Sequence, residues 1–174
     1  MSLLPIITLP DPILRQKSTP VERVDDDLRR TLDDMLETMY DAPGVGLAAN
    51  QVNIAKRFIV VDAGNNSDDD DTETRNPICL INPEIVSRSD TLRSCEEGCL
   101  SLPDVRVDIE RPERITVRYL DRAGEPVELE AEGFLATVIQ HEVDHLDGRL
   151  IIDFLSSLRR DVIVRRFKKL ARQG

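Results

Sequence analysis

The chain has 174 residues and a mass of 19.7 kDa, a length that predicts one domain over residues 1–174. Its formal charge of −10 argues against a nucleic-acid-binding protein of the usual basic kind, so we expect no DNA partner. The sequence contains no apolar run near the roughly 20 residues of a membrane helix, and its short, proline-broken N-terminus is not a signal peptide. Together with only three cysteines, these features predict a cytoplasmic protein with free thiols and no membrane contact.

The first half of the chain is predicted to contain one helix and one buried strand. Residues up to Pro20 are expected to be extended, and a helix then follows over 26–41. One stripe of this helix is apolar at helical spacing: Leu28, Leu32, Met35 and Met39. The β-branched run over 58–61 predicts a strand, and residues 63–77, with four consecutive aspartates at 68–71, predict a solvated loop.

The second half is predicted to contain short strands followed by two helices. We expect strands over 79–82, 84–88, 115–121 and 127–132, with a turn at 122–126. Helices are expected over 134–146 and, with an amphipathic and basic character, over about 153–172. The fold class is therefore α+β. We expect a compact single domain, with small, mainly antiparallel sheets around the helix at 134–146 and with an N-terminal and a C-terminal helix.

Both histidines of the chain lie in the predicted central helix, at His141 and His145. A spacing of four places both imidazoles on one helix face, where they can bind the same metal ion. Glu142 lies about 100° round the helix, close enough to move a proton at that ion without binding it. The alternative is a helix whose histidines merely pack, but Phe134 and Val138 extend the same face inward, where unbonded imidazoles are costly.

A metal held by two histidines needs a further ligand. The acidic residues after the helix are close to its end or in the basic tail: Asp147, Asp153 and Asp161. A thiolate is the remaining choice, and Cys99 stands out because Gly98 before it allows an unusual backbone approach. Cys79 and Cys95 are instead predicted to be small, buried core residues.

A third segment, Gly44–Val52, is rich in glycine and alanine, which lets the backbone pass close to another group. It lacks the third glycine and the preceding strand of a dinucleotide-binding loop. Tight packing between a helix and a strand would explain the small residues but not Gln51. The amide of Gln51 can donate a hydrogen bond to a developing oxyanion.

These three segments together resemble the peptide deformylases. The family has a glycine- and alanine-rich segment that ends in Gln, then Glu-Gly-Cys-apolar-Ser, then Gln-His-Glu-x-Asp-His followed by Leu. Here these motifs are Gly44–Gln51, Glu97–Ser101 and Gln140–Leu146, in the same order and spacing. The resemblance implies a metal-dependent hydrolase that removes the N-formyl group from the N-terminal methionine of newly synthesised polypeptides and releases formate.

The resemblance also implies a role for each residue of the reaction centre. Cys99, His141 and His145 would hold one divalent metal ion with water as the fourth ligand. The ion is natively Fe²⁺ in the family, and Zn²⁺, Ni²⁺ or Co²⁺ can substitute. Glu142 would take the proton of the water and pass it to the leaving amine. The oxyanion would be held by two donors, the Gln51 side chain and the Leu100 backbone N–H.

Further residues are expected to bind the N-formylmethionyl peptide or to support the site. By resemblance, Val45 and Gly46 pair with the substrate backbone as an added strand would, and Arg106 faces the substrate. Phe134 and Val138 would line the methionine pocket. An ion pair, Arg111–Asp144, would orient the metal-binding helix.

Two other functions remain open at the level of the sequence. A metallopeptidase of the zincin type would use the same helix but needs a third ligand other than Cys99. A non-catalytic metal-binding or interaction module would need neither Glu142 nor Gln51.

The tail carries a charge opposite to that of the body. Residues 155–174 hold seven basic residues against one acidic residue, for a net charge of +6, so the other 154 residues carry −16. An apolar stripe in the tail predicts partial packing on the body: Leu155, Leu158, Val162, Ile163, Phe167 and Leu170. The basic face either solvates the helix or contacts the negatively charged ribosome from which nascent chains emerge.

Overall fold

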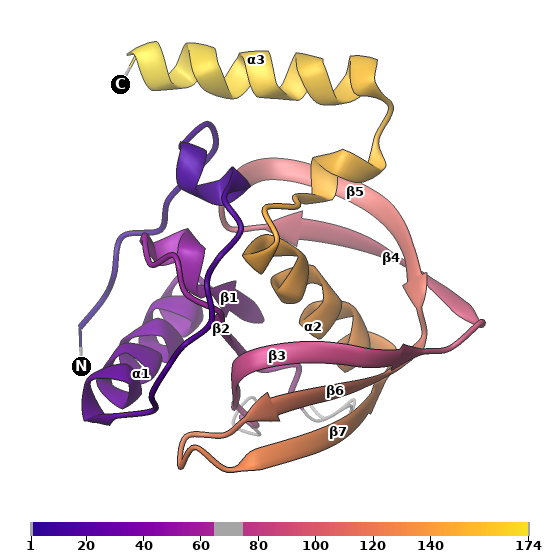
Figure 1. Ribbon diagram of the computed structural model, residues 1–174. Helices are drawn as coiled ribbons and strands as arrows, with labels where there is room; N and C mark the ends of the chain where they lie inside the picture. Colours follow the sequence, from indigo (N-terminus) through magenta and orange to yellow (C-terminus); the bar gives the residue numbers. More distant parts are fainter. Residues whose placement is uncertain (1, 65–74, 174) are drawn as a thin grey trace.

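The computed structural model describes residues 2–64 and 75–173 (Figure 1). Three α-helices lie in this part of the chain: α1 (Asp26–Asp41), α2 (Gly133–Leu146) and α3 (Ser157–Gln173). Its strands are β1 (Gly46–Ala48), β2 (Phe58–Val61), β3 (Ile78–Arg88), β4 (Leu92–Cys99), β5 (Leu102–Pro112), β6 (Arg114–Leu120) and β7 (Pro126–Glu132). The aspartates 68–71 of the predicted acidic loop lie outside the described residues.

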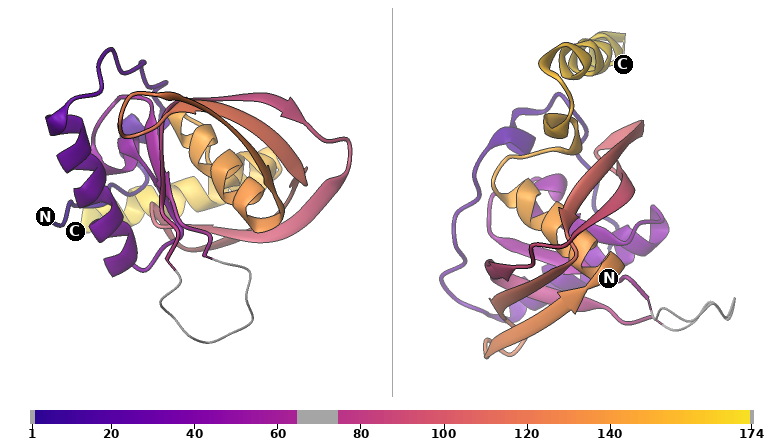
Figure 2. Two further views of the ribbon diagram at one scale, coloured as in Figure 1. Left: turned by 90° about the horizontal axis from the view of Figure 1, so that it is seen from below. Right: turned by 90° about the vertical axis from the view of Figure 1, so that its right-hand side faces the viewer.

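The strands form two antiparallel sheets. Five strands pair in the order β1-β2-β3-β6-β7, and β4 and β5 form a separate two-stranded ribbon. Helix α2 contacts strands of both sheets and lies between the larger sheet and the ribbon (Figure 2). The predicted α+β class, with antiparallel sheets around a central helix, is confirmed.

Two apolar layers cover opposite faces of the larger sheet. Helix α2 packs on one face through Val138, Ile139 and Leu146, against strand residues such as Ile59 and Val117. Helix α1 packs on the other face through the four predicted residues, which are all buried: Leu28, Leu32, Met35 and Met39. Asp25 caps α1 by accepting a hydrogen bond from the Leu28 N–H. A third apolar cluster joins the N-terminal segment to β5 and α3.

Several predicted elements differ from the observed ones. The segment up to Pro20 contains a short 3₁₀ helix at Pro12–Arg15. The two strands expected over 79–82 and 84–88 are one strand, β3, which bends where Asn82 adopts a φ of 53°. The bend is held because the Asn82 amide exchanges two hydrogen bonds with the backbone of Val21. Strands β1, β4 and β5 were not predicted.

The C-terminal helix begins later than predicted and lies mostly outside the body (Figure 1). Leu155 precedes α3, between that helix and a 3₁₀ helix at Ile151–Phe154. Within the predicted apolar stripe, Phe167 is buried, whereas Leu158, Val162 and Leu170 are exposed. The stripe therefore packs on the body at only part of its length. Across residues 2–64 and 75–173, every helix is too short or too polar to span a bilayer.

Candidate metal centre and active site

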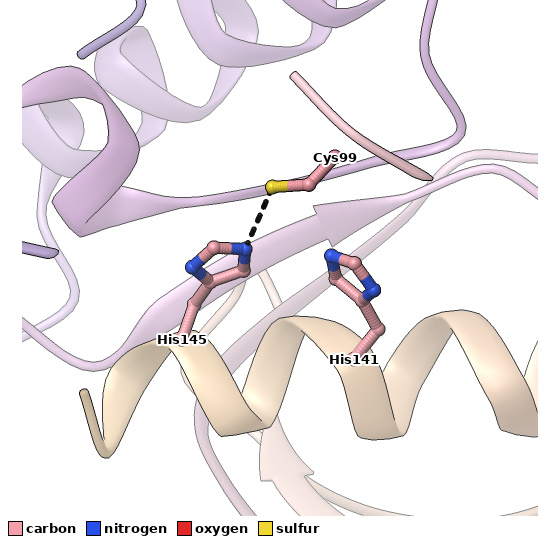
Figure 3. A group of neighbouring side chains, drawn as sticks. All are labelled: Cys99, His141 and His145. Atoms are coloured by element: carbon pink, nitrogen blue, oxygen red, sulfur yellow. Dashed lines mark hydrogen bonds between the residues drawn. The ribbon is translucent and has the colours of Figure 1, made fainter. Parts of the chain in front are cut away.

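Helix α2 and the end of β4 bring the three predicted ligands together (Figure 3). The Cys99 Sγ lies 3.2 Å from the His145 Nε2, and the centroids of the two imidazole rings are 5.1 Å apart. One ligand atom from each of Cys99, His141 and His145 lies within 4.8 Å of the other two. Among the described residues, this is the one group of three or more histidine, cysteine or carboxylate side chains with that proximity.

The acidic residues considered as alternative ligands lie elsewhere. Asp147 pairs with Arg57 at 3.0 Å, and Asp153 pairs with Arg15 at 2.7 Å. Asp161 lies in α3, at the exposed surface. None of the three belongs to the cluster around the histidines, so the third ligand that a zincin-type peptidase needs is not found in the described chain.

The donor set fits a divalent transition metal. A thiolate and two imidazoles are ligands that Fe²⁺ and Zn²⁺ both accept. Burial lowers the pKa of His145 well below its usual value and so favours the neutral form that binds metals. Beside the ligand cluster, two buried polar atoms make no hydrogen bond within the described structure. They are the Glu142 Oε2 and the His145 Nδ1. Burial raises the pKa of Glu142 to about 7.

An ion-pair network beneath the centre connects β4, β5 and α2. The Arg111 guanidinium donates to both carboxylate oxygens of Glu97, at 2.7 and 3.1 Å, and to the Asp144 Oδ2 at 2.8 Å. Glu97 also contacts the His141 Nδ1, at 2.8 Å, which leaves the His141 Nε2 facing the cysteine. The hydrogen bonds of His141 and Arg111 hold the pKa of Glu97 below its usual value, despite the opposing effect of burial.

Sequence reasoning placed the Arg111–Asp144 pair but gave no role to Glu97. Its position was informative, because residues two apart in a strand share a face and Glu97 is two residues before Cys99. Asn50 was also missed. Its side-chain amide donates to the His145 carbonyl at 2.6 Å and so satisfies one of the last carbonyls of α2.

Gln51 has a fixed orientation in a 3₁₀ helix (Ala49–Val52). Its Oε1 accepts a hydrogen bond from the Ala48 N–H at 2.9 Å, so its amide nitrogen must point the other way. The Nε2 donates to the Ser101 Oγ at 3.0 Å and lies 3.6 Å from the Cys99 Sγ. One amide hydrogen therefore fixes the side chain, and the second is directed towards the metal ligands.

Two glycines allow the close approaches that the sequence predicted. A Cβ on Gly46 would lie 2.8 Å from the Glu142 Cγ, so only glycine lets β1 pass over that carboxylate. A Cβ on Gly98 would lie 1.8 Å from a guanidinium nitrogen of Arg106, which covers this point of β4.

A cavity of about 620 Å³ opens onto the cluster. Most of the predicted site residues line it: Val45, Gly46, Gln51, Cys99, Leu100, Arg106, Phe134, Val138, His141 and Glu142. His145 is buried behind them, and Arg111 and Asp144 lie in the ion-pair network. Cys95 was predicted to be a buried core residue, and this is wrong. It is half-buried and lines the cavity, because the inward face of β4 borders the cavity and not the core.

Comparison with known proteins agrees with this geometry. The sequence profile described as "Polypeptide deformylase" matches residues 3–161. The chain belongs to the polypeptide deformylase family. Peptide deformylase of Rhizobium meliloti is 53% identical over 172 residues, which is 99% of this chain and 96% of that protein. Peptide deformylase of Bartonella quintana is 52% identical over 173 residues, 99% of this chain and 96% of its own length.

A solved structure leads to the same family. The crystal structure of peptide deformylase from Ehrlichia chaffeensis has a TM-score of 0.90 and 42% sequence identity, and the match covers 99% of this chain and 98% of that one. Deformylases are metal-dependent hydrolases that remove the N-formyl group from nascent polypeptides. The family, the fold and the reaction predicted from the three motifs are confirmed.

The ion-pair network generates a prediction about stability. Arg111→Met removes the cation shared by the two carboxylates, and breaking a buried pair costs about 3–5 kcal/mol. Denaturant unfolding should show a loss of that size. The matched control is Arg118→Met, because Arg118 pairs with Glu128 at the exposed surface, where a pair contributes about 1 kcal/mol or less. Equal losses in the two variants would contradict a structural role for the network.

Proposed function

We propose that this deformylase holds one divalent metal ion with Cys99, His141 and His145, and moves the reaction's proton with Glu142. The observation that carries the proposal is that Cys99, His141, Glu142 and Gln51 line one cavity, with His145 buried behind them and within reach of the same ion. A bound divalent ion supplies Lewis acidity, which polarises a carbonyl and makes water acidic enough to attack it near neutral pH. The steps below describe what the protein's own side chains do.

Glu142 accepts the proton of the attacking water at its Oε2 and delivers it to the nitrogen of the leaving amine. This oxygen is buried but makes no hydrogen bond within the described structure, and the residue lines the cavity where a formyl group can enter. The other oxygen, Oε1, lies 3.6 Å from the His141 Nε2, so the carboxylate is held beside the ligand set. Gly46 above it leaves space for the substrate.

Gln51 and Leu100 bind the formyl oxygen as it becomes an oxyanion. The Gln51 side chain is already oriented by hydrogen bonds at its Oε1 and its Nε2, and the second amide hydrogen, directed towards the Cys99 Sγ, can be donated to the oxygen with little reorganisation. The backbone N–H of Leu100, the residue next to Cys99, supplies the second donor.

The peptide lies along β1, with the methionine side chain in the cavity. Strand β1 is an edge strand of the larger sheet, so it pairs with β2 on one side only. Val45 and Gly46 border the cavity on the other side, where a substrate backbone can add a strand. Phe134 and Val138 provide an apolar wall for the thioether, and Arg106 lies at the rim.

We propose Fe²⁺ as the native ion, with Zn²⁺, Ni²⁺ or Co²⁺ as functional substitutes. The support is the family resemblance together with a sulfur ligand that suits these metals. We also propose that residues 1–174 act as one domain in the cytoplasm, where nascent chains are made.

The tail is proposed to contact the ribosome. Six of its basic residues are exposed on α3: Arg159, Arg165, Arg166, Lys168, Lys169 and Arg172. The helix lies outside the body (Figure 1), so this charge can approach an RNA surface while the active site stays open to substrate.

The first test concerns the base. Glu142→Ala should leave the metal content unchanged, because Glu142 is not a ligand, and should lower formate release by at least about 100-fold. Metal analysis and turnover of a formyl-methionyl dipeptide are measured on the same preparation. Normal turnover, or loss of metal together with activity, would refute the role.

The second test concerns the thiolate ligand. Cys99→Ser should weaken metal binding or change the metal's spectrum, whereas Cys95→Ser should keep metal and turnover. Cys95 is the matched control because it lines the same cavity from the same strand. The ligand assignment would be wrong if Cys95→Ser lost the metal and Cys99→Ser kept it.

The third test concerns the ribosome. Reversing Arg165, Lys168 and Lys169 to Glu changes the charge by −6 and should abolish salt-sensitive co-sedimentation with ribosomes. Dipeptide turnover should not change, since α3 does not line the active-site cavity. Unchanged co-sedimentation would leave the basic face with a solvating role only.

A further inference from the structure

The rim of the cavity beside β1 is a short loop held at both ends by one residue, Asp62. Residues 42–45 connect α1 to β1, and all four border the active-site cavity. Before the loop, the hydroxyl of Tyr40 in the last turn of α1 donates to the Asp62 Oδ2. After the loop, the Asp62 backbone N–H donates to the Val45 carbonyl at 2.8 Å. The loop and these two bonds form a closed ring.

The side chain of Asp62 is buried and held by several hydrogen bonds. It follows the last residue of β2, and only 7% of it is exposed. Its carboxylate also accepts from the Gly64 N–H at 2.9 Å and the Asn76 N–H at 3.1 Å, so three donors, with the Tyr40 hydroxyl, converge on this buried group. A carboxylate that accepts several hydrogen bonds is held in a single orientation.

Tyr40 is equally constrained. Arg75 lies over its ring, 4.0 Å from the ring centroid. Burial and the hydrogen bond to Asp62 raise the pKa of Tyr40 well above its usual value, so the hydroxyl remains a donor. The only other tyrosine of the chain, Tyr119, is half-buried in β6, and its hydroxyl makes no side-chain hydrogen bond among the described residues.

The ring stabilises the start of β1, which is a short strand at the edge of the larger sheet. Its ladder to β2 covers only Gly46–Ala48, and Val45 is the residue just beyond it, with 42% of its surface exposed. The bond from Asp62 extends the ladder by one residue, so Val45 keeps the strand conformation at the cavity rim. Without the bond from Asp62 to Val45, the N-terminal end of β1, which receives the substrate backbone, would fray.

We propose that Tyr40 and Asp62 are positioning residues for the peptide substrate: they hold Val45 in strand conformation so that the backbone beyond the formylmethionine can pair with β1. This rests on the proposed placement of the substrate along β1. Neither residue lines the cavity, and both act through Val45. The expected consequence is a defect in substrate binding and not in the chemical step.

The test compares Tyr40→Phe with Tyr119→Phe, each measured with formylmethionine and with a formyl-methionyl tripeptide. Tyr40→Phe should raise KM for the tripeptide by about 3- to 10-fold, a fraction of what one hydrogen bond to a charged group can contribute, and leave kcat and metal content unchanged. The effect on formylmethionine should be much smaller, because it has no following backbone to pair. Tyr119→Phe should match the unmodified enzyme on both substrates.

A second pair of variants distinguishes loss of the positioning role from general misfolding. Asp62→Asn keeps an acceptor oxygen and should retain most of the tripeptide affinity, whereas Asp62→Ala should lose more than Tyr40→Phe. The inference is overturned if Tyr40→Phe equals Tyr119→Phe, or if it lowers kcat for both substrates alike. Failure of the unmodified enzyme to release formate from either substrate would instead overturn the proposed function.

Discussion

The bridge made by Arg111 joins the two elements that carry the ligand cluster. Cys99 comes from the β4–β5 ribbon and the histidines from α2, and no backbone hydrogen bond joins these described elements. Arg111 binds Glu97 on the ribbon and Asp144 on the helix, and Glu97 in turn holds His141. A buried cation between two carboxylates is costly unless all its partners are present, so the network tolerates one arrangement of ribbon and helix. That arrangement is the one in which the three ligand atoms converge.

Most other buried polar groups around the centre also have hydrogen-bond partners. The Gln51 amide, the last carbonyls of α2 and the carboxylate of Asp62 all find fixed partners in neighbouring elements. Asn50, Glu142 and His145 are the exceptions in this region, each with one buried side-chain atom that has no partner in the described structure. Buried polar groups are normally satisfied, and the exceptions often mark a functional site. Two of these three residues, Glu142 and His145, are the ones proposed for proton transfer and metal binding, and Asn50 contacts the backbone of His145.

The sequence predicted those parts of the fold that have a regular period or a continuous apolar run. Helix α1 and the strands β6 and β7 have one face towards the core, whereas β2 is a β-branched run buried on both faces and α2 is buried around most of its circumference. Strand β4 has none, because its inward residues face the cavity and α2 and are polar or reactive: Arg93, Cys95, Glu97 and Cys99. The residues that the site requires therefore replace the alternating apolar pattern from which β4 could have been predicted. Strand β5 does alternate, with Val105, Val107 and Ile109 on its buried face, and this pattern in the sequence indicates a strand that the prediction lacks. The apolar stripe of α3 was correctly placed on a helix, but periodicity does not tell which part of a stripe meets the body.

The central claim is that a metal held by one cysteine and two histidines of this chain is needed to release formate. The most direct measurement determines metal content and formate release together, on protein purified without oxygen, before and after removal of the metal by a chelator. The account predicts one divalent ion per chain, formate from a formyl-methionyl dipeptide but no acetate from its acetylated analogue, and loss of activity that returns with Fe²⁺. Undiminished formate release from metal-free protein, or equal hydrolysis of the acetylated dipeptide, would contradict it.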